Sequence, residues 1–411
     1  MKFFLIVICV SISLYSQEFS TSTMRPMNLN EAFNLSLKRS EMLASKKEYI
    51  KELEAQEKSL TSNILPKISF NINTVKKEDI SLFTKGYLST NYQFFSGMKD
   101  YIAIKAMGDK QKSASMLIED AKRNLYMDVV EAYWNLFNAQ KVVGIFKEKI
   151  ELDNKRIDEL KKRVKIGRSR ESEVVSAVSQ LMQDKASYLD SILNERISQE
   201  IIKFLTGVDY DIVPVDYNYD YKNYELSYYL EMAKKRPDIE SKRLDVSYYR
   251  RMYEGEKNNF YPSIVTSANL YPLISPLSQQ NNRWDISVYL NMPIYSAGEL
   301  KAKKDLSFSS LKTAEIELEL AIRQAESEVR QAFEEARYSR LRTESIRDAL
   351  ISAKQNVQYQ EEDYRLGLVT NLDVLNSMND LLQLKISLSK AEAEEKILAE
   401  RLRIVSGENI E

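Results

Sequence analysis

A stretch of about forty residues occurs twice in the chain, and this repeat limits the possible folds more than any other feature. Gly167 and Gly207 bound the first copy, whereas Gly367 and Gly407 bound the second, so the offset is 200 residues at both ends. No gap is needed between these glycines. A constant offset repeats geometry as well as composition, and two long copies therefore predict two superposable halves.

The same register extends upstream of the repeat. VVEAY at 129–133 matches VRQAF at 329–333, and a proline precedes the strand-like segments of each half, at Pro66 and Pro262. Each half thus reads as helix, proline, short strands, glycine, very long helix, glycine turn, long helix and glycine. We divide the chain into a signal peptide (1–22), a first repeat (23–207), a linker (208–225) and a second repeat (226–411).

Composition excludes several classes of function. The 411-residue chain has a net charge of −1, so it lacks the excess of positive charge that would indicate a nucleic-acid-binding protein. It contains no histidine, which removes the commonest metal ligand and the usual general base at neutral pH. Histidine-dependent catalysis and most zinc chemistry are therefore excluded, and no cofactor is predicted.

The N-terminus has the pattern of a secretory signal peptide, with a lysine, an apolar run over 3–14 and then small polar residues. The run is too short to span a bilayer comfortably as an anchor. Its Cys9 is the only cysteine, and Ile8 stands where lipoprotein signals need a small residue. Cleavage between residues 13 and 22 would leave a mature chain without disulfides.

Four segments alternate strictly or loosely between apolar and polar residues: 68–73, 88–94, 264–270 and 284–292. A soluble sheet packed on a core would have the same pattern, but here only very long helices flank each pair. Apolar residues outside and polar residues inside are typical of a transmembrane barrel. Four strands cannot enclose a lumen, since about eight are needed even to leave room for side chains. The strands therefore predict an oligomer if they lie in a membrane.

The remaining chain is predicted to be helical. The first helices are expected at 30–63, with Asn28 or Asn30 as the cap, and at 226–259, with a break near Pro237. The segments 97–165 and 298–365 are poor in glycine and periodic. Each would reach roughly 100 Å at 1.5 Å per residue. The second has a coiled-coil-like seam of mostly alanine and leucine: Leu311, Ala314, Leu318, Ala321, Ala325, Val329, Ala332 and Ala336.

The return helices are expected to end with glycine C-caps at Gly207 and Gly407. The linker that follows the first of them is rich in tyrosine. We expect it to lie against the helices, because a stacking platform would need supporting charge that is absent. Its tyrosines are Tyr210, Tyr217, Tyr219, Tyr221 and Tyr224.

These features together resemble the TolC-like outer-membrane efflux proteins over essentially the whole mature chain. The resemblance rests on the signal peptide, the LNEA opening at 29–32, the duplicated halves, the paired strands and the turn GLVTNLDVL at 367–375. It implies a mainly α fold with a small β part. It also implies a homotrimer in which each chain gives four strands to a 12-stranded barrel in outer-membrane lipid, continued by a long periplasmic tube of helices. The function implied is a passive exit duct that joins a periplasmic adaptor and an inner-membrane pump, not an enzyme.

The resemblance also implies that the two helix-turn-helix tips, at 165–170 and 365–370, meet the adaptor. Glycine lets the chain reverse between two helices, so a plain turn explains part of the pattern. The contact residues implied are Lys165, Gly167, Arg168, Arg365, Gly367, Leu368 and Thr370.

A constriction just inside the tip is implied at Asp373 and Asn376, where family members often carry two acidic residues one turn apart. Three Asp373 carboxylates around a threefold axis would attract cations, and Asn376 makes this ring weaker than a double one. Asp373 is equally suited to the first turn of a helix, where the dipole favours it, and both explanations can hold.

A tyrosine–carboxylate latch closes the tip in some members, and Tyr364 and Glu173 occupy its positions. The arginine that assists the latch is matched by Val369, whereas Arg168 and Arg170 lie in the opposite turn. The alternative to a duct is a periplasmic or surface coiled-coil spacer without a pore. An enzyme ranks third, since no nucleophile or phosphate-loop motif is recognisable.

Overall fold

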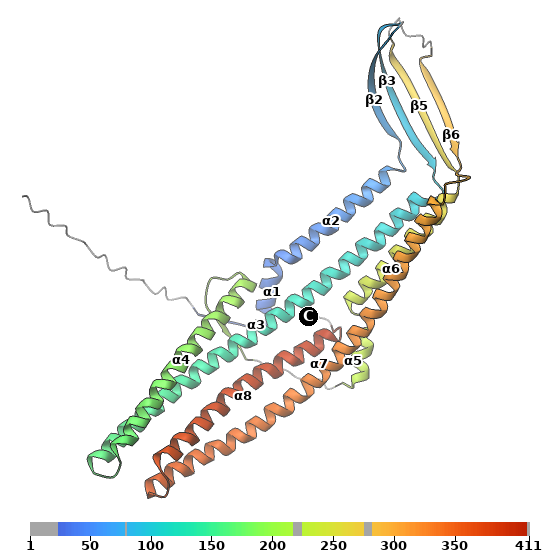
Figure 1. The fold of residues 1–411 in the computed structure, drawn as a ribbon. Coiled ribbons are helices and arrows are strands. Elements are labelled where there is room, and N and C mark those ends of the chain that lie inside the picture. The colour runs from blue at the N-terminus through green and yellow to red at the C-terminus, as the bar shows by residue number, and fades with distance from the viewer. Residues whose placement is uncertain (1–23, 79, 217–223, 275–281, 409–411) are drawn as a thin grey trace, which may run out of the picture.

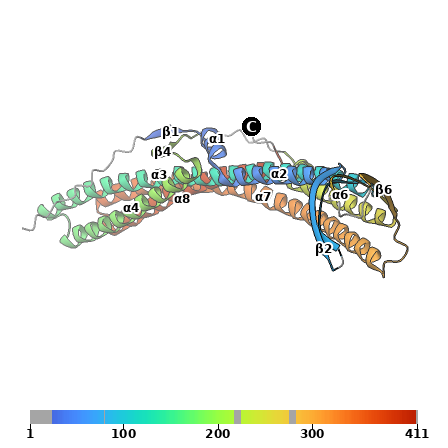
Figure 2. The same ribbon diagram turned by 90° about the horizontal axis from the view of Figure 1, so that it is seen from above.

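The computed structural model describes residues 24–78, 80–216, 224–274 and 282–408. The expected signal peptide, Cys9 and the linker tyrosines Tyr217, Tyr219 and Tyr221 lie outside these residues. The described chain is mainly helical with a small β part, as predicted: a four-stranded sheet stands at one end of a long rod of helices, and two helical turns form the other end (Figure 1). Seen from above, the rod is bowed along its length (Figure 2).

The elements follow the order predicted for each half. The first half contains β1 (Arg25–Met27), α1 (Leu29–Arg39), α2 (Glu41–Ser62), β2 (Lys67–Lys77), β3 (Ile80–Phe95), α3 (Lys99–Lys165) and α4 (Glu171–Thr206). The remainder contains β4 (Ile212–Pro214), α5 (Leu226–Ala233), α6 (Pro237–Lys257), the 3₁₀ turn η1 (Asn258–Phe260), β5 (Ser263–Ile274), β6 (Trp284–Asn291), α7 (Glu299–Leu366) and α8 (Asn371–Val405).

The two long helices run the length of the rod and have 67 and 68 residues. Near the turns the helices pack in the order α4, α3, α8, α7, and toward the sheet in the order α2, α3, α6, α7 (Figure 1). The apolar seam predicted for α7 faces the neighbouring helices. Five of its residues are buried: Leu311, Ala314, Ala325, Val329 and Ala332. The outer edges of the rod are therefore α2 and α4 on one side and α7 on the other.

The sheet is antiparallel in the order β2-β3-β5-β6, and its predicted strands all form, mostly with a few extra residues. Polar side chains share one row across the four strands, formed by Ser69, Ser89, Asn269 and Asp285. Residues that pair across strands point to the same face, so the next row, Phe70, Leu88, Leu270 and Trp284, faces the other way. Within the described residues β2 and β6 each have a neighbour on one side alone, which leaves two free edges.

Two helix boundaries differ from the prediction. The helix expected at 30–63 is broken at Ser40, whose backbone is extended and whose hydroxyl accepts a hydrogen bond from the Leu43 amide at 3.3 Å. Serine competes with the helix in this way because its side chain can replace a backbone acceptor. Asn28 is the cap of α1, as expected. Gly207 caps α4, as predicted. Helix α8 stops one residue earlier relative to its glycine, with Ser406 as the cap, but Gly407 still ends it: its φ is 95°, and its amide donates to the carbonyl of Ile404 at 3.1 Å.

A short parallel pair, β1 with β4, was not predicted, so the four alternating segments are not the chain's only strands. The pair ties the first described residues to the linker. The buried hydroxyl of Tyr133 donates to the carbonyl of Met27 at 2.9 Å and accepts from the amide of Val215 at 2.8 Å. The amide group of Gln199 bonds both backbone groups of Ile212. The described part of the linker thus lies against the core at the middle of the rod.

Candidate functional site at the helical tips

The two turns lie together at the end of the rod that is farthest from the sheet (Figure 1). Gly167 and Gly367 have φ values of 71° and 77°, a left-handed backbone that most side chains disfavour. A Cβ added at either glycine would meet no atom within 4 Å. The glycines are therefore required by the direction of the backbone and not by crowding.

Every residue predicted to meet a partner at the tips is exposed in the isolated chain. These residues are Lys165, Gly167, Arg168, Arg365, Gly367, Leu368 and Thr370. Apolar side chains accompany them, since Ile166 is 66% and Leu368 71% exposed. The turn between α3 and α4 is also strongly basic, with exposed cations at Lys161, Lys162, Lys165, Arg168 and Arg170. The tips thus combine exposed apolar side chains with a local excess of positive charge.

Tyr364 and Glu173, the residues predicted as a latch, touch each other. The hydroxyl of Tyr364 on α7 donates to Oε2 of Glu173 on α4 at 2.8 Å, and Ser169 donates to the same oxygen at 2.6 Å. Tyr364 is buried, and this burial raises the pKa of its hydroxyl, so it remains a donor at neutral pH. The contact joins the α3/α4 hairpin to the α7/α8 hairpin.

Two arginines of α3 complete this contact, and neither was predicted from the sequence. The guanidinium carbons of Arg156 and Arg163 lie 4.4 Å and 4.7 Å from the centre of the Tyr364 ring. Arg156 also donates to Oδ1 of buried Asn371 at 2.8 Å and 3.1 Å. Cations over an aromatic face add attraction beyond burial. We call Arg156, Arg163, Glu173, Tyr364 and Asn371 the tip cluster; it draws one or two residues from each of four helices.

Asp373 has a local partner in its own turn. Its Oδ2 accepts from the amide of Thr370 at 2.8 Å and from the Thr370 hydroxyl at 2.6 Å, which forms a capping box at the start of α8. These hydrogen bonds lower the pKa of the exposed Asp373 carboxyl. Asn376 is exposed on the same helix three residues later. Both side chains are therefore free to face solvent or a pore.

Only part of the tip cluster could be predicted from the sequence. Arg156 and Arg163 are seven residues apart and two turns along one face of α3, but many charged residues of α3 have such spacing. Their meeting with Tyr364, which lies on α7, depends on how α3 packs against the α7/α8 hairpin. Among the described residues no group of histidine, cysteine or acidic side chains is arranged to hold a metal ion, and no helix combines the length and apolar character needed to cross a membrane.

Comparison with known proteins gives concordant results. Residues 229–408 match the family model for outer membrane efflux proteins. The chain is similar to the outer membrane efflux protein BepC of Brucella suis, at 19% identity over 79% of this chain and 72% of that protein. It is also similar to the outer membrane protein TolC of Vibrio cholerae, at 21% identity over 81% and 80% of the two chains. The crystal structure of the Campylobacter jejuni CmeC outer membrane channel has the same fold, with a TM-score of 0.82, 20% identity and coverage of 92% of this chain and 85% of that chain.

Proposed function

Because this chain belongs to the TolC-like outer-membrane efflux proteins, we propose that three copies form the exit duct of a tripartite efflux or type I secretion system. In this proposal the sheets share one barrel in the outer membrane, and the helical rods form a periplasmic tube. The duct is passive. It takes its cargo from an inner-membrane pump through a periplasmic adaptor.

The observation that carries the proposal is the open four-stranded sheet. Exposed strand edges invite pairing with another chain, and β2 and β6 are both free. The exposed apolar row that contains Phe70 and Trp284 is suited to lipid, and the polar row that contains Ser69 and Asp285 is suited to a lumen. Three copies would supply twelve strands, enough to enclose a channel, whereas four strands cannot.

The tips supply the proposed partner contacts and the proposed gate. The adaptor would meet Lys165, Arg168 and Leu368 through a hairpin that carries acidic and apolar side chains, because the first turn is basic. The tip cluster would hold the closed state. Asp373, repeated three times about the axis, would form the constriction that attracts cations.

Conductance distinguishes the duct from a spacer. Protein extracted in detergent and reconstituted into a planar lipid bilayer should form ion-conducting pores at protein concentrations where it is an oligomer. A monodisperse oligomer that never conducts would contradict the duct and favour a coiled-coil spacer, and a water-soluble monomer would contradict both the trimer and the membrane insertion.

A further inference from the structure

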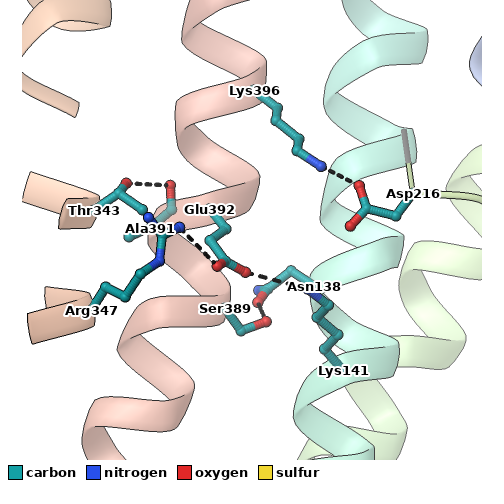
Figure 3. A network of polar contacts seen from close by, with 9 residues as sticks. All are labelled: Asn138, Lys141, Asp216, Thr343, Arg347, Ser389, Ala391, Glu392 and Lys396. Atoms are coloured by element: carbon teal, nitrogen blue, oxygen red, sulfur yellow. Dashed lines mark hydrogen bonds and ion pairs between the residues drawn. The ribbon is translucent and has the colours of Figure 1, made fainter. Parts of the chain in front are cut away.

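Charges in the helical rod hold its helices to one another, whereas two cations of the sheet are not used in this way. In the rod, Glu392 of α8 lies 3.3 Å from both Lys141 of α3 and Arg347 of α7 (Figure 3). In the sheet, Lys85 of β3 and Arg283, which directly precedes β6, take part in no ion pair among the residues that the structure describes. Their charges are therefore available to a ligand.

The register of the sheet places Lys85 on its polar face. Lys85 and Tyr87 lie four and two residues before Ser89, which belongs to the polar row, and the pairing of β3 with β2 is unbroken between them. Alternate residues of a strand share a face, so these three side chains point the same way. Gly86 between them pairs with Ile72, which is 64% exposed on the apolar face. In the proposed duct the polar face lines the lumen.

Two tyrosines accompany Lys85 on this face. The ring centres of Tyr87 and Tyr271 are 5.5 Å apart, and Nζ of Lys85 lies 5.8 Å from each of them. The aromatic girdles of a membrane barrel face lipid. At this level the apolar face carries Leu273, which pairs with Gly86 and is 58% exposed. The two tyrosines are therefore not part of a lipid-facing girdle.

Arg283 lies beside Tyr271 on the neighbouring strand. The amide of Tyr271 donates to the carbonyl of Arg283 at 2.8 Å, which continues the register that pairs Asn269 with Asp285. Arg283 is exposed and shares the polar face, because it is two residues from Asp285. The Asp285 carboxylate accepts a hydrogen bond from Asn269 at 2.9 Å. We use the name mouth cluster for four residues: Lys85, Tyr87, Tyr271 and Arg283.

The mouth cluster lies far from the helices. Lys85 is ten residues from Phe95, where β3 ends beside the rod. Ten residues span about 33 Å along a strand, or roughly 25 Å along the axis of a barrel whose strands are tilted by about 40°. The apolar band of a transmembrane barrel is about 25 Å tall. In the proposed duct the cluster thus lies where the lumen opens to the outside.

We propose that the mouth cluster binds aromatic anions as they leave the duct. Lys85 and Arg283 attract the carboxylate or sulfonate group, and the rings of Tyr87 and Tyr271 stack on the aromatic part. This inference rests on the proposed function, because only a closed barrel makes the polar face a lumen. It goes further because it assigns a binding site and a class of cargo to the duct.

The composition of the polar face favours this class of ligand. A simple anion would need cations but no rings, and a neutral aromatic compound would need rings but no cations. Closer to the helices the same face carries hydroxyl and amide groups, at Ser89, Asn91 and Gln93 of β3. Three copies would repeat the mouth cluster around the axis, and rings of lysine and arginine favour anions in a pore.

Photoaffinity labelling tests the site in the full-length protein, extracted in detergent as an oligomer. The probe is 4-benzoylbenzoate, an aromatic anion that inserts into nearby C–H bonds under ultraviolet light. It should label the peptides that contain Tyr87 and Tyr271. An excess of 2-naphthoate should prevent this labelling, whereas cyclohexanecarboxylate, which has the charge but no aromatic ring, should not. Labelling that 2-naphthoate does not reduce, or that both competitors reduce equally, would overturn the inference.

Variants of Lys85 test the role of the charge. Lys85→Gln should raise the probe concentration for half-maximal labelling by about tenfold, because a charge-assisted contact is lost. Lys85→Arg keeps the charge and should behave as wild type. Lys67→Gln is the matched control: Lys67 pairs with Asn91 on the same face, at the end of the sheet beside the helices. Equal labelling of Lys85→Gln and wild type would contradict the site.

Single cysteines test which face meets water. The only native cysteine, Cys9, lies in the expected signal peptide. In the oligomer a water-soluble anionic thiol reagent should modify Lys85→Cys and leave Leu88→Cys unmodified, because Leu88 belongs to the apolar row that faces detergent or lipid. Modification of Leu88→Cys alone would place the mouth cluster in lipid and overturn the inference.

The outcomes separate this inference from the proposed function. An oligomer that conducts ions in a planar bilayer, but whose labelling does not respond to 2-naphthoate, would overturn the site and leave the duct intact. A protein that never conducts would contradict the duct, and the inference would fall with it.

Discussion

Glu173 and Asp373 occupy equivalent positions in the two repeats, yet their carboxylates have different partners. Glu173 accepts hydrogen bonds from Tyr364 and Ser169, whereas Asp373 accepts both of its bonds from Thr370. The sequence predicted both residues as parts of a gate. It did not predict the capping box, which lowers the pKa of Asp373 and keeps its carboxylate charged.

The first prediction separates the charge of Asp373 from its capping role. Asp373→Asn removes the charge but retains an oxygen that can accept from Thr370, whereas Asp373→Ala removes both. If three carboxylates line the constriction, either change should raise the concentration of a trivalent cation needed to block the pore by on the order of tenfold, or about 1.4 kcal/mol. Asn376→Asp should lower that concentration. Equal block of wild type and Asp373→Asn in a planar bilayer would show that Asp373 does not line the pore.

The second prediction concerns the bond between Tyr364 and Glu173. Tyr364→Phe keeps the ring beside Arg156 and Arg163 but removes the hydroxyl, which should cost about 1–2 kcal/mol of closed-state stability. Reconstituted channels should then spend more time in a state of higher conductance. Tyr359→Phe is the control, because Tyr359 is 65% exposed on the same helix. Identical conductance of the two variants would contradict a latch.

At the scale of elements, each helical tip depends on one glycine with a left-handed backbone, Gly167 in the first turn and Gly367 in the second. Because the left-handed φ of Gly367 is the whole constraint there, Gly367→Val should disturb the turn and Gly367→Asn should be tolerated, since asparagine adopts this geometry readily. We expect efflux in cells to fall with valine and to persist with asparagine, while both variants remain trimers. Full efflux with valine would indicate that the α7–α8 turn makes no functional contact.

The α3/α4 hairpin contains a buried ionic cluster that its counterpart lacks. Nζ of Lys149 lies 2.9 Å from Oδ2 of Asp184 and is also ion-paired with Asp153, and all three are 4–5% exposed. Equivalent positions in the α7/α8 hairpin are Ala349, Leu384 and Ala353. Burial raises the pKa of Asp153 to about 6, with the Asp184 carboxylate adding to the shift and Lys149 opposing it.

This shift predicts how the hairpin responds to pH. The pKa of Asp153 is higher in the folded chain than in the unfolded chain, where it has the usual value of about 3.9. The protonated carboxyl therefore stabilises the fold, and this contribution is complete below about pH 4. That contribution is lost as the pH rises through about 6. Amide exchange over 149–184, corrected for intrinsic rates, should be slower at pH 5 than at pH 7.5, and Asp153→Asn should remove the difference. An equal difference in the variant would contradict this role of Asp153.

The sequence predicted elements best where a period or a repeat was long. The 67 residues of α3 and the alternating strands were recognisable, because each buried face recurs many times. The break at Ser40 and the three-residue strands β1 and β4 were not, since a single hydroxyl and three residues leave no periodic signal. The tip cluster was missed in part because it depends on packing between helices that are distant in sequence.

At the scale of the whole molecule, each chain is one layer of helices and strands with two different edges. One edge carries β2, α2 and α4, and the other carries β6 and α7. The repeat in the sequence indicated two similar halves, but only their packing shows which helices are left at the edges.

Electron cryo-microscopy of the detergent-extracted protein tests the assembly most directly. We expect a particle with threefold symmetry, in which twelve strands enclose one lumen that continues through a tube of helices and narrows at Asp373. Helix α4 of each copy should lie against α7 of the next. A single chain with an open sheet, or an oligomer whose strands do not close around a common lumen, would contradict the duct.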